Sequence, residues 1–372
     1  MRVVITGQVG LDKKAFLQRV ADLAREEDFP LKMYNVGEMM YEEAPHVQPG
    51  KILDLPLNQL NSLRRSVFKD ILNGAERHSN VLVNTHATFR WRHGLFYAFD
   101  YDQMKELDAD IYVVLVDNID RVHHRLVRDG HTDHTLKDLM VWREEEILAT
   151  ELVSQIVSGP RCFYIFAGSA EHGDEQAGAL LRLIARREMK KAYLSFPMTH
   201  VMDKPDLLRD IEGFRREMKR HFVCFDPGDM EEKYLCQLAM EAASSGQRVI
   251  RTGPSDGLSG TMEVSQMLDI IADIDGQIYA RDFKLIDQAD MIVSLIPELE
   301  DGRPGLSSGV ERELQHAHEA TRDVYVIWQP KAEPSPFITE TATRVFRSTD
   351  EAVTYFQESD LVPPPPHGTL FA

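Results

Sequence analysis

The chain has 372 residues, of which 43% are hydrophobic and 27% charged, and its formal net charge is −18 at pH 7. The length predicts two domains of about 150 to 200 residues, and the composition is that of a globular protein in water. The negative charge argues against binding to nucleic acid polymers. The chain contains no run of about 18 apolar residues, which is the length that a membrane-spanning helix needs.

The first residues and the cysteines indicate in which cellular compartment the protein is expected. Met1 leads directly into an apolar strand, which leaves no room for a signal peptide, so we expect a cytoplasmic protein. Cys162, Cys224 and Cys236 are odd in number and widely spaced, so we expect buried thiols rather than disulfides or a zinc site. The histidines at 123–124 and 131–134 lack a matching carboxylate pattern, so no metal site is predicted.

The first half of the chain alternates short apolar strands with amphipathic helices. An apolar strand at 2–7 runs into a glycine loop and then into a helix that continues to about Glu26. Further expected elements are a strand near 32–36, a helix near 60–72, strands at 80–83, 111–116 and 162–167, and a helix at 175–190. This alternation predicts a parallel sheet with helices on both faces.

The glycine loop reads Gly7-Gln-Val-Gly10-Leu-Asp-Lys13-Lys-Ala. In a phosphate loop, glycines let backbone N–H groups wrap a phosphate, a lysine reaches the outer phosphates and a hydroxyl holds magnesium. Gly7, Gly10 and Lys13 are therefore candidate nucleotide-binding residues. Asp12 stands where the second glycine belongs and Lys14 replaces the hydroxyl, so we expect weak binding of ATP in the usual pose. A carboxylate about 4 Å from a phosphate costs on the order of several kcal/mol.

The first 190 residues resemble the archaeal-type adenylate kinases of the P-loop fold, over the segments 3–7, 32–41, 80–88 and 107–114. The resemblance implies a kinase fold, with ATP and magnesium as cofactors if this domain is active. However, Asn84 occupies a position where that family carries an aspartate, and the segment 125–133 has fewer arginines than a phosphoryl-transfer clamp would use. The domain could therefore bind a nucleotide without reacting.

Five basic residues could hold a nucleoside monophosphate in this first domain: Lys51, Arg64, Arg65, Arg90 and Arg92. The alternative is that Arg64 and Arg65 lie on a solvated helix face and that Arg90 and Arg92 belong to a mobile loop. The sequence favours this second interpretation.

A charged helix ends near residue 190 and a new strand follows, so we place the domain boundary there. The expected domains are 1–190 and 191–360, followed by a proline-rich tail at 361–372. No flexible linker joins them, so we expect them to pack together. Strands are expected near 192–196, 222–226, 247–252, 291–296 and 324–328, with a helix starting near Val310. In a doubly wound sheet, Asp226, Asp229 and the loop 253–260 would share one crevice.

Asp282 and Glu313 are the candidate catalytic residues of the second half. We expect Glu313 in the first turn of its helix, where free N–H groups could bind a phosphate beside Ser307, Ser308 and Gly309. Cleavage of an N-glycosidic bond needs one carboxylate on the sugar face and a second acid near the base, which these two residues could supply. Alternatively, the helix dipole stabilises Glu313 and Asp282 is only a helix cap.

The pattern Arg281-Asp282 … Gln288-Ala-Asp290 … Ser307-x-Gly309-Val-x-x-Glu313 resembles the nucleoside 2-deoxyribosyltransferase family, and within it the 2'-deoxynucleoside 5'-phosphate N-hydrolases, over about 191–330. The resemblance implies that Glu313 is the nucleophile at C1', that Asp282 positions and protonates the departing base, and that Ser307 contacts the 5'-phosphate. Tyr193, on a segment similar to the family's first strand, is a candidate substrate contact. The loop 297–306 is longer than expected, so base and sugar preference stay open.

The sequence thus predicts an α/β protein of two domains, each a parallel sheet flanked by helices, the first P-loop kinase-like and the second flavodoxin-like. The leading functional hypothesis is an N-glycosidase or deoxyribosyltransferase that acts on a nucleoside or a nucleoside 5'-monophosphate and requires no cofactor. By resemblance we also expect a homo-oligomer, namely a dimer. An active nucleoside monophosphate kinase and a non-catalytic nucleotide sensor are the alternatives.

Overall fold

The computed structural model describes residues 1–160, 162–169, 171–198, 201, 204–230, 232–252 and 260–362. By internal contacts the chain divides into unit 1, which comprises Met1–Leu181 and Met230–Gln277, and unit 2, which comprises Arg182–Asp229 and Ile278–Ala372. The chain thus leaves unit 1, returns to it and leaves it again. The domain boundary near residue 190 stays a prediction of the sequence.

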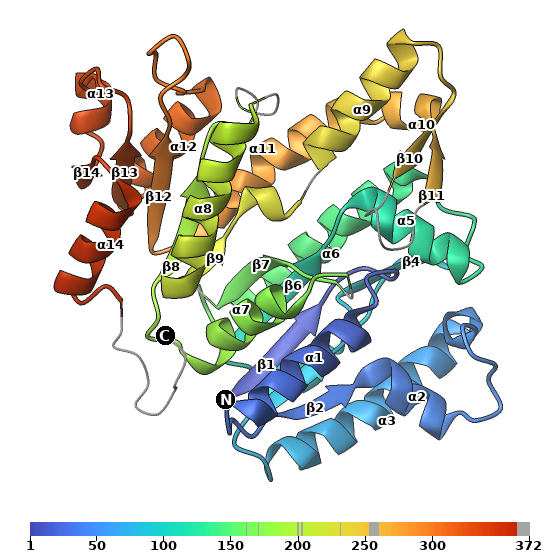
Figure 1. Ribbon diagram of the computed structural model, residues 1–372. Helices are drawn as coiled ribbons and strands as arrows, with labels where there is room; N and C mark the ends of the chain where they lie inside the picture. Colours follow the sequence, from blue (N-terminus) through green and yellow to red (C-terminus); the bar gives the residue numbers. More distant parts are fainter. Residues whose placement is uncertain are drawn as a thin grey trace. The chain divides into compact units, whose positions relative to one another are not determined.

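Unit 1 is built on a five-stranded parallel sheet (Figure 1). Its strands, in spatial order, are β2 (Lys32–Asn35), β3 (Val81–Asn84), β1 (Arg2–Thr6), β6 (Ile111–Val116) and β7 (Phe163–Ala167). Every residue of β6 is buried, as are most of β1 and β3. Strands buried on both faces read as continuous apolar runs, which is why the sequence predicted them well. The order of connection reverses at β1, where ligand sites of open α/β sheets form.

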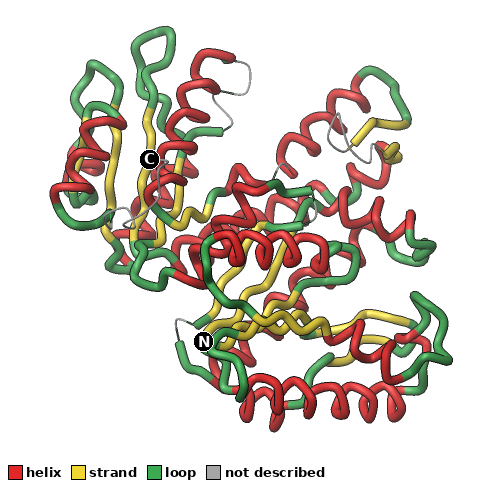
Figure 2. Tube along the Cα trace, turned by 60° about the horizontal axis from the view of Figure 1, so that its bottom comes forward, coloured by secondary structure: helices red, strands yellow, loops and turns green. Residues whose placement is uncertain are grey.

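Helices cover this sheet, and a short hairpin adjoins it (Figure 2). The helices up to residue 185 are α1 (Lys13–Glu26), α2 (Val36–Glu43), α3 (Leu57–Ala75), α4 (Tyr101–Leu107), α5 (Ile119–Arg128), α6 (Leu136–Val157) and α7 (Asp174–Ala185), with a short 3-10 turn at Ile52–Asp54. The hairpin pairs β4 (Thr88–Trp91) with β5 (Gly94–Tyr97). The helix expected at 175–190 ends early because Met189 is buried in a turn and donates its N–H to the carbonyl of Arg186.

The segment that returns to unit 1 does not add to a parallel sheet. It contains α9 (Glu232–Ser244), β10 (Val249–Thr252), β11 (Gly260–Glu263), α10 (Val264–Leu268) and most of α11 (Ile271–Gln288). The prediction that 247–252 belongs to the second parallel sheet is wrong, because β10 pairs antiparallel with β11. Its alternating exposed and buried residues are typical of a strand with one solvated face. The loop 253–259 lies outside the described residues.

Unit 2 has its own five-stranded parallel sheet. The strands, in spatial order, are β14 (Arg344–Phe346), β13 (Asp323–Trp328), β12 (Met291–Ile296), β8 (Lys191–Ser195) and β9 (Val223–Phe225). In chain order this is the 2-1-3-4-5 arrangement of flavodoxin-like folds, which confirms the predicted fold class. The helices that lie wholly in unit 2 are α8 (Pro205–His221), α12 (Ser308–Glu319), α13 (Pro336–Thr339) and α14 (Thr349–Glu358).

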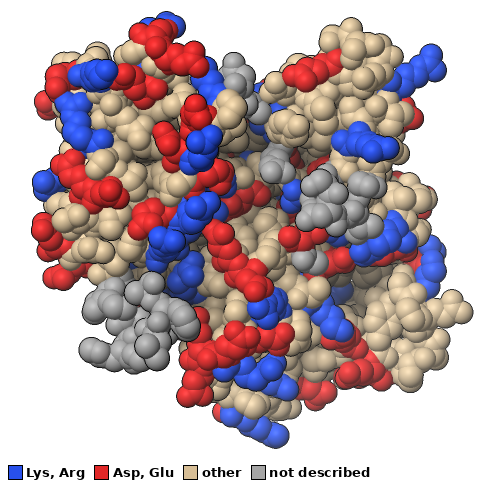
Figure 3. All heavy atoms as spheres, viewed as in Figure 1, with Lys and Arg blue, Asp and Glu red and all other residues tan. Residues whose placement is uncertain are grey.

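The three cysteines are free thiols, of which Cys224 and Cys236 are buried and Cys162 is half-buried. Among the described residues, no helix combines the length and the apolar character needed to cross a membrane. Acidic and basic side chains are mixed over the face drawn in Figure 3. The tail at 363–372 and the residues Thr199 and His200 lie outside the described part of the chain.

Candidate functional site

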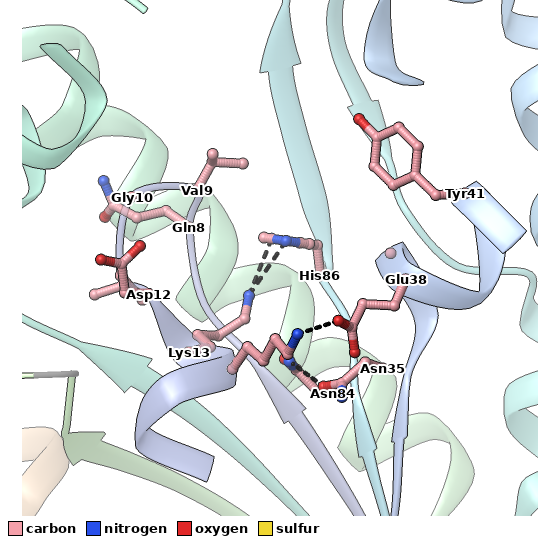
Figure 4. A pocket seen from close by; sticks show the side chains of 13 residues that line it. Gln8, Val9, Gly10, Asp12, Lys13, Asn35, Glu38, Tyr41, Asn84 and His86 are labelled. Atoms are coloured by element: carbon pink, nitrogen blue, oxygen red, sulfur yellow. Dashed lines mark hydrogen bonds and ion pairs between the residues drawn. The ribbon is translucent and has the colours of Figure 1, made fainter. Parts of the chain in front are cut away.

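A cavity of about 300 Å³ opens beside the loop that follows β1 (Figure 4). Its lining combines residues of this loop with α2 and the end of β3: Gln8, Val9, Gly10, Leu11, Asp12, Lys13, Lys14, Asn35, Gly37, Glu38, Tyr41, Asn84 and His86. The loop is tightly packed at its first glycine. Gly7 has a φ of 142°, and a Cβ there would lie 2.6 Å from Leu11 Cδ1 and 2.8 Å from the carbonyl oxygen of Leu115. Only glycine is accommodated at this position.

Glu146 of α6 holds the loop in place. Its Oε1 accepts hydrogen bonds from the N–H groups of Gly7 (2.9 Å) and Ala87 (2.8 Å), and its Oε2 accepts two from Thr88, both 2.7 Å. The side chain is buried, and these bonds join the segment after β1 to the segment after β3. The sequence analysis missed this residue because a glutamate in a long helix is usually solvated.

Lys13 is buried and folded back onto the loop. Its ammonium donates to the carbonyl of Gly7 and lies 3.1 Å from Nδ1 and 3.3 Å from Nε2 of His86. Burial lowers the pKa of Lys13 to about 7, although the charge of Glu146 opposes this shift. Burial, and then the charge of Lys13, lower the pKa of His86. A bound phosphate would favour the protonated form of Lys13.

The loop carboxylate that the sequence analysis noted is paired with a cation. Asp12 has a φ of 51°, in the left-handed region that aspartate tolerates better than most residues. Its carboxylate lies 3.1 Å from Nη2 of Arg128, at the end of α5. Arg125, one turn earlier, is buried, pairs with Asp117 at 2.6 Å and donates to the carbonyl of Gly10 at 3.0 Å. Both arginines of the segment 125–133 are thus engaged within unit 1.

A second, more apolar cavity of about 210 Å³ shares walls with the first. Its lining residues are Val9, Val36, Gly37, Met40, Tyr41, Gly50, Ile52, Leu53, Arg64, Thr85, His86, Phe89, Trp91, Ala98 and His131. Arg64 is the cation among them. Burial lowers the pKa of its guanidinium to about 10, and its Nη2 has no hydrogen-bond partner among the described residues. A buried donor of this kind fits an anionic or carbonyl group of a ligand.

The sequence analysis favoured a solvated helix face for Arg64 and Arg65 and a mobile loop for Arg90 and Arg92. This interpretation is wrong for Arg64 and Arg90. Arg64 lies on the buried face of α3, in line with Leu60 and Val67, so it is not on a solvated face. Arg90 lies on β4 and pairs with Glu145, so it is not in a mobile loop. The other three are exposed and ion-paired: Arg65 with Asp100, and Arg92 and Lys51 with Asp54.

In unit 2 the two candidate catalytic carboxylates lie near each other. Glu313 accepts a hydrogen bond at Oε1 from the hydroxyl of Tyr193 (3.1 Å) and one at Oε2 from the hydroxyl of Ser195 (2.6 Å). Tyr193 and Ser195 are two residues apart on β8, so their side chains share one face of the sheet. Burial raises the pKa of Glu313 to about 7, the bond from Ser195 opposes this shift, and the charge of Asp282 adds to it.

Asp282 lies within α11, well away from its ends, so its interpretation as a helix cap is wrong. Burial raises the pKa of this carboxyl to about 6, against the effect of neighbouring Arg281. Its Oδ1 accepts no hydrogen bond from the described residues. Burial, and to a lesser extent the charges of Asp282 and Glu313, raise the pKa of the Tyr193 hydroxyl.

The helix that carries Glu313 starts earlier than expected. Ser307 caps it by accepting a hydrogen bond from the N–H of Val310 (3.2 Å), and α12 begins at Ser308. The prediction that Glu313 lies in the first turn is therefore wrong, and Glu311 is the first-turn acid. Since the dipole effect fades within one turn, it does not account for the state of Glu313. Ser307, Ser308 and Gly309 do lie at the helix N-terminus.

The placement of this site follows the topology of the sheet. The strand order reverses between β8 and β12, and ligands of open α/β sheets bind at the carboxyl ends of the strands at such a point. Ser195 is the last residue of β8, and α12 follows β12. In contrast, Asp226 and Asp229, expected in the same crevice, are engaged by Arg215 and Lys219.

The comparisons with known proteins concern the first half of the chain. A family model described as an AAA domain matches residues 6–143. The adenylate kinase of Pyrococcus furiosus is 26% identical over 180 residues, which are 47% of this chain and 90% of that protein. That of Methanococcus vannielii is 27% identical over 153 residues, 39% of this chain and 78% of the relative. A shikimate kinase structure from Bacteroides thetaiotaomicron covers 49% of this chain and 95% of its own, with 16% identity and a TM-score of 0.34.

The first half of the chain is therefore similar to adenylate kinases and carries a P-loop kinase-like domain, as its motifs predicted.

Proposed function

We propose that unit 2 is an N-glycosidase or deoxyribosyltransferase that acts on a nucleoside or a nucleoside 5'-monophosphate. One observation carries this proposal: the half-buried carboxylate of Glu313 is oriented by two hydroxyl groups at the switch point of a flavodoxin-like sheet, beside the second acid Asp282. A carboxylate fixed in this way suits attack on an anomeric carbon.

In the proposed reaction, an oxygen of Glu313 forms an ester with C1' of the sugar while the bond from C1' to the base breaks. The electron pair of that bond goes to the base nitrogen, which takes a proton from Asp282. Water, or a second base, then attacks C1', returns a proton to Asp282 and frees Glu313. The N-terminus of α12, at Ser307, Ser308 and Gly309, would receive the 5'-phosphate on its free N–H groups.

The test is release of free base from a panel of nucleosides and nucleoside 5'-monophosphates, followed by chromatography. We expect base release from the wild type without metal and its loss in Glu313→Gln. Glu311→Gln is the matched control, because Glu311 is an exposed acid on the same helix and should retain activity. Undiminished release by Glu313→Gln would refute the proposed nucleophile.

For unit 1 we propose a nucleotide-binding role without phosphoryl transfer. Similarity to adenylate kinases and the two joined cavities, one with Lys13 and the other with Arg64, support nucleotide binding. The paired Asp12 and Arg128 and the replacement of the hydroxyl by Lys14 disfavour catalysis. ADP formation from ATP, magnesium and a nucleoside monophosphate, abolished in Lys13→Ala, would instead establish an active kinase.

A further inference from the structure

The cavity beside Lys13 does not offer the ligands that magnesium takes in a phosphate loop. Such loops hold the ion with the hydroxyl that follows the lysine and with a carboxylate from a neighbouring strand. Here Lys14 follows Lys13, and its ammonium is ion-paired with Glu38 of α2. A cation thus stands where a metal ligand is expected.

The neighbouring strand supplies an amide in place of a carboxylate. Asn84, the last residue of β3, donates through Nδ2 to Oδ1 of Asn35 at 2.9 Å. Its own Oδ1 is buried and accepts no hydrogen bond from the described residues. One neutral oxygen is a poor substitute for the charged ligands that magnesium prefers.

The acids that do line the cavity are already ion-paired with basic side chains. Asp12 pairs with Arg128, and Glu38 pairs with Lys14. Among the described residues, no group of three or more His, Cys, Asp or Glu side chains could hold a metal ion. The donor set therefore does not fit magnesium, whereas Lys14 and, once protonated, Lys13 offer positive charge to an anion.

We infer that this cavity binds a nucleoside polyphosphate as the free anion, without a divalent cation, and that the ammonium of Lys14 supplies the charge that a metal would otherwise supply. The inference rests on the proposed nucleotide-binding role of unit 1. Binding displaces Glu38 from Lys14, because the phosphate oxygens compete for the same ammonium. A nucleotide that already carries magnesium brings a second cation toward Lys14 and binds less well.

The first test is isothermal titration calorimetry of the full chain with ATP, in excess EDTA and in excess magnesium. We expect the affinity for metal-free ATP to exceed that for magnesium ATP by about tenfold or more, since like charges about 4 Å apart repel strongly even at an effective dielectric of 20. Tighter binding with magnesium would overturn the inference but leave the nucleotide-binding role intact. No binding under either condition would overturn both.

A variant gives the second test. Lys14→Ser combined with Asn84→Asp restores a hydroxyl and a carboxylate, so magnesium should now strengthen ATP binding. Lys69→Ser, which removes an exposed lysine of α3 outside both cavities, is the matched control and should keep the preference for the free anion. A double variant that still prefers metal-free ATP would overturn the role of Lys14. The wild-type titration stands even if the double variant fails to fold.

Discussion

At the scale of single residues, Glu313 and Lys13 show burial acting on opposite charges. Burial disfavours the carboxylate of Glu313 and the ammonium of Lys13, so the pKa of each moves to about 7 from opposite directions. The two hydroxyls on Glu313 only partly offset this effect. Each residue therefore titrates near neutral pH, which is common for groups that act on substrates.

Glu313→Gln should be more stable than the wild type above pH 7 and similar to it near pH 5. The pKa of Glu313 is raised from 4.5 to about 7, so between these values the unfolded chain has lost a proton that the folded chain keeps. Wild-type stability therefore falls as the pH rises through this window, by about 1 to 3 kcal/mol, and the variant lacks this loss. Urea unfolding of both proteins at pH 5 and pH 8 measures the difference. Equal pH dependence would contradict the assignment.

Ser195→Ala should shift the pH profile of base release as well as slow it. The hydrogen bond from Ser195 lowers the pKa of Glu313, so its loss should raise that pKa. Because the pKa of the acid Asp282 is lower, at about 6, Glu313 governs the alkaline limb of the profile, which should move upward by about half a unit to one unit, and kcat should fall about tenfold. Ser294→Ala is the control, since Ser294 lies opposite Ser195 on β12 and its hydroxyl has no hydrogen-bond partner among the described residues. A slower reaction with an unshifted profile would reduce Ser195 to a structural role.

ATP binding at pH 8 should take up close to one proton. Free Lys13, with a pKa of about 7, is mostly neutral at that pH, and a bound phosphate would favour its protonated form. Affinity should accordingly decline as the pH rises above about 7. Calorimetry in buffers of different ionisation enthalpy counts the proton, and the uptake through Lys13 should shrink toward zero at pH 6. Proton release at pH 8 would exclude this linkage.

At the scale of elements, the sequence predicted what depends on local pattern. The buried strands β1, β6 and β12 were found because they are continuous apolar runs. The antiparallel pairing of β10 depends on a partner strand and could not be read from its own residues. Likewise, the sequence placed the start of α12 near Val310, whereas the helix is capped by Ser307. Several neighbouring residues could begin this helix, and only the conformation of the folded loop selects one of them.

The residues of the candidate sites also divide into those that a local motif predicts and those whose role depends on distant partners. Asp282, Glu313 and Lys13 were found because each belongs to a spaced motif. Ser195 and Glu146 were missed because their importance comes from partners more than 100 residues away in the sequence. Arg64 was read as solvated because an arginine is seldom part of a buried helix face, and only the packing of α3 reveals that it is.

The ion pair between Asp12, in the loop after β1, and Arg128 of α5 leads to a prediction about Asp12. Asp12→Gly removes a left-handed non-glycine residue but also an exposed ion pair worth about 0 to 1 kcal/mol, so stability should change little. Affinity for ATP should rise about tenfold, because a carboxylate no longer faces the phosphates. Asp12→Asn keeps tolerance of the left-handed conformation and removes only the charge, so it should behave similarly. Unchanged affinity in both variants would show that Arg128 already cancels the carboxylate.

At the scale of the whole molecule, the path of the chain joins distant segments within unit 1. Arg143 of α6 and Glu232 of α9 are both buried and pair at 2.6 Å, although 89 residues separate them. Arg143 also donates to the side-chain oxygen of Gln277 at 2.5 Å. Unit 1 as described is therefore not the same as residues 1–190.

A fragment that contains only residues 1–190 should be less stable than the corresponding part of the full chain, because it leaves Arg143 buried without Glu232. Loss of one partner from a buried pair costs about 3 to 5 kcal/mol. Glu232→Gln in the full chain should reproduce much of this loss, and Arg143→Met with Glu232→Leu should recover part of it. Urea unfolding compares the fragment and the two variants with the wild-type chain. A fragment as stable as the full chain would favour a boundary near 190.

The path of the chain between the units also bears on synthesis at the ribosome. The loop at Gly7 leaves the ribosome first, yet Glu146, which holds it, follows 139 residues later. Residues 230–277, which complete unit 1, emerge only after β8 and β9 of unit 2. At about 5 to 20 residues per second, the nascent chain waits roughly 4 to 17 seconds between residues 190 and 277 with neither unit complete. During this interval β8 lacks its neighbour β12, which is made only after residue 277, so the last segment of unit 1 is available before the sheet of unit 2 can be completed.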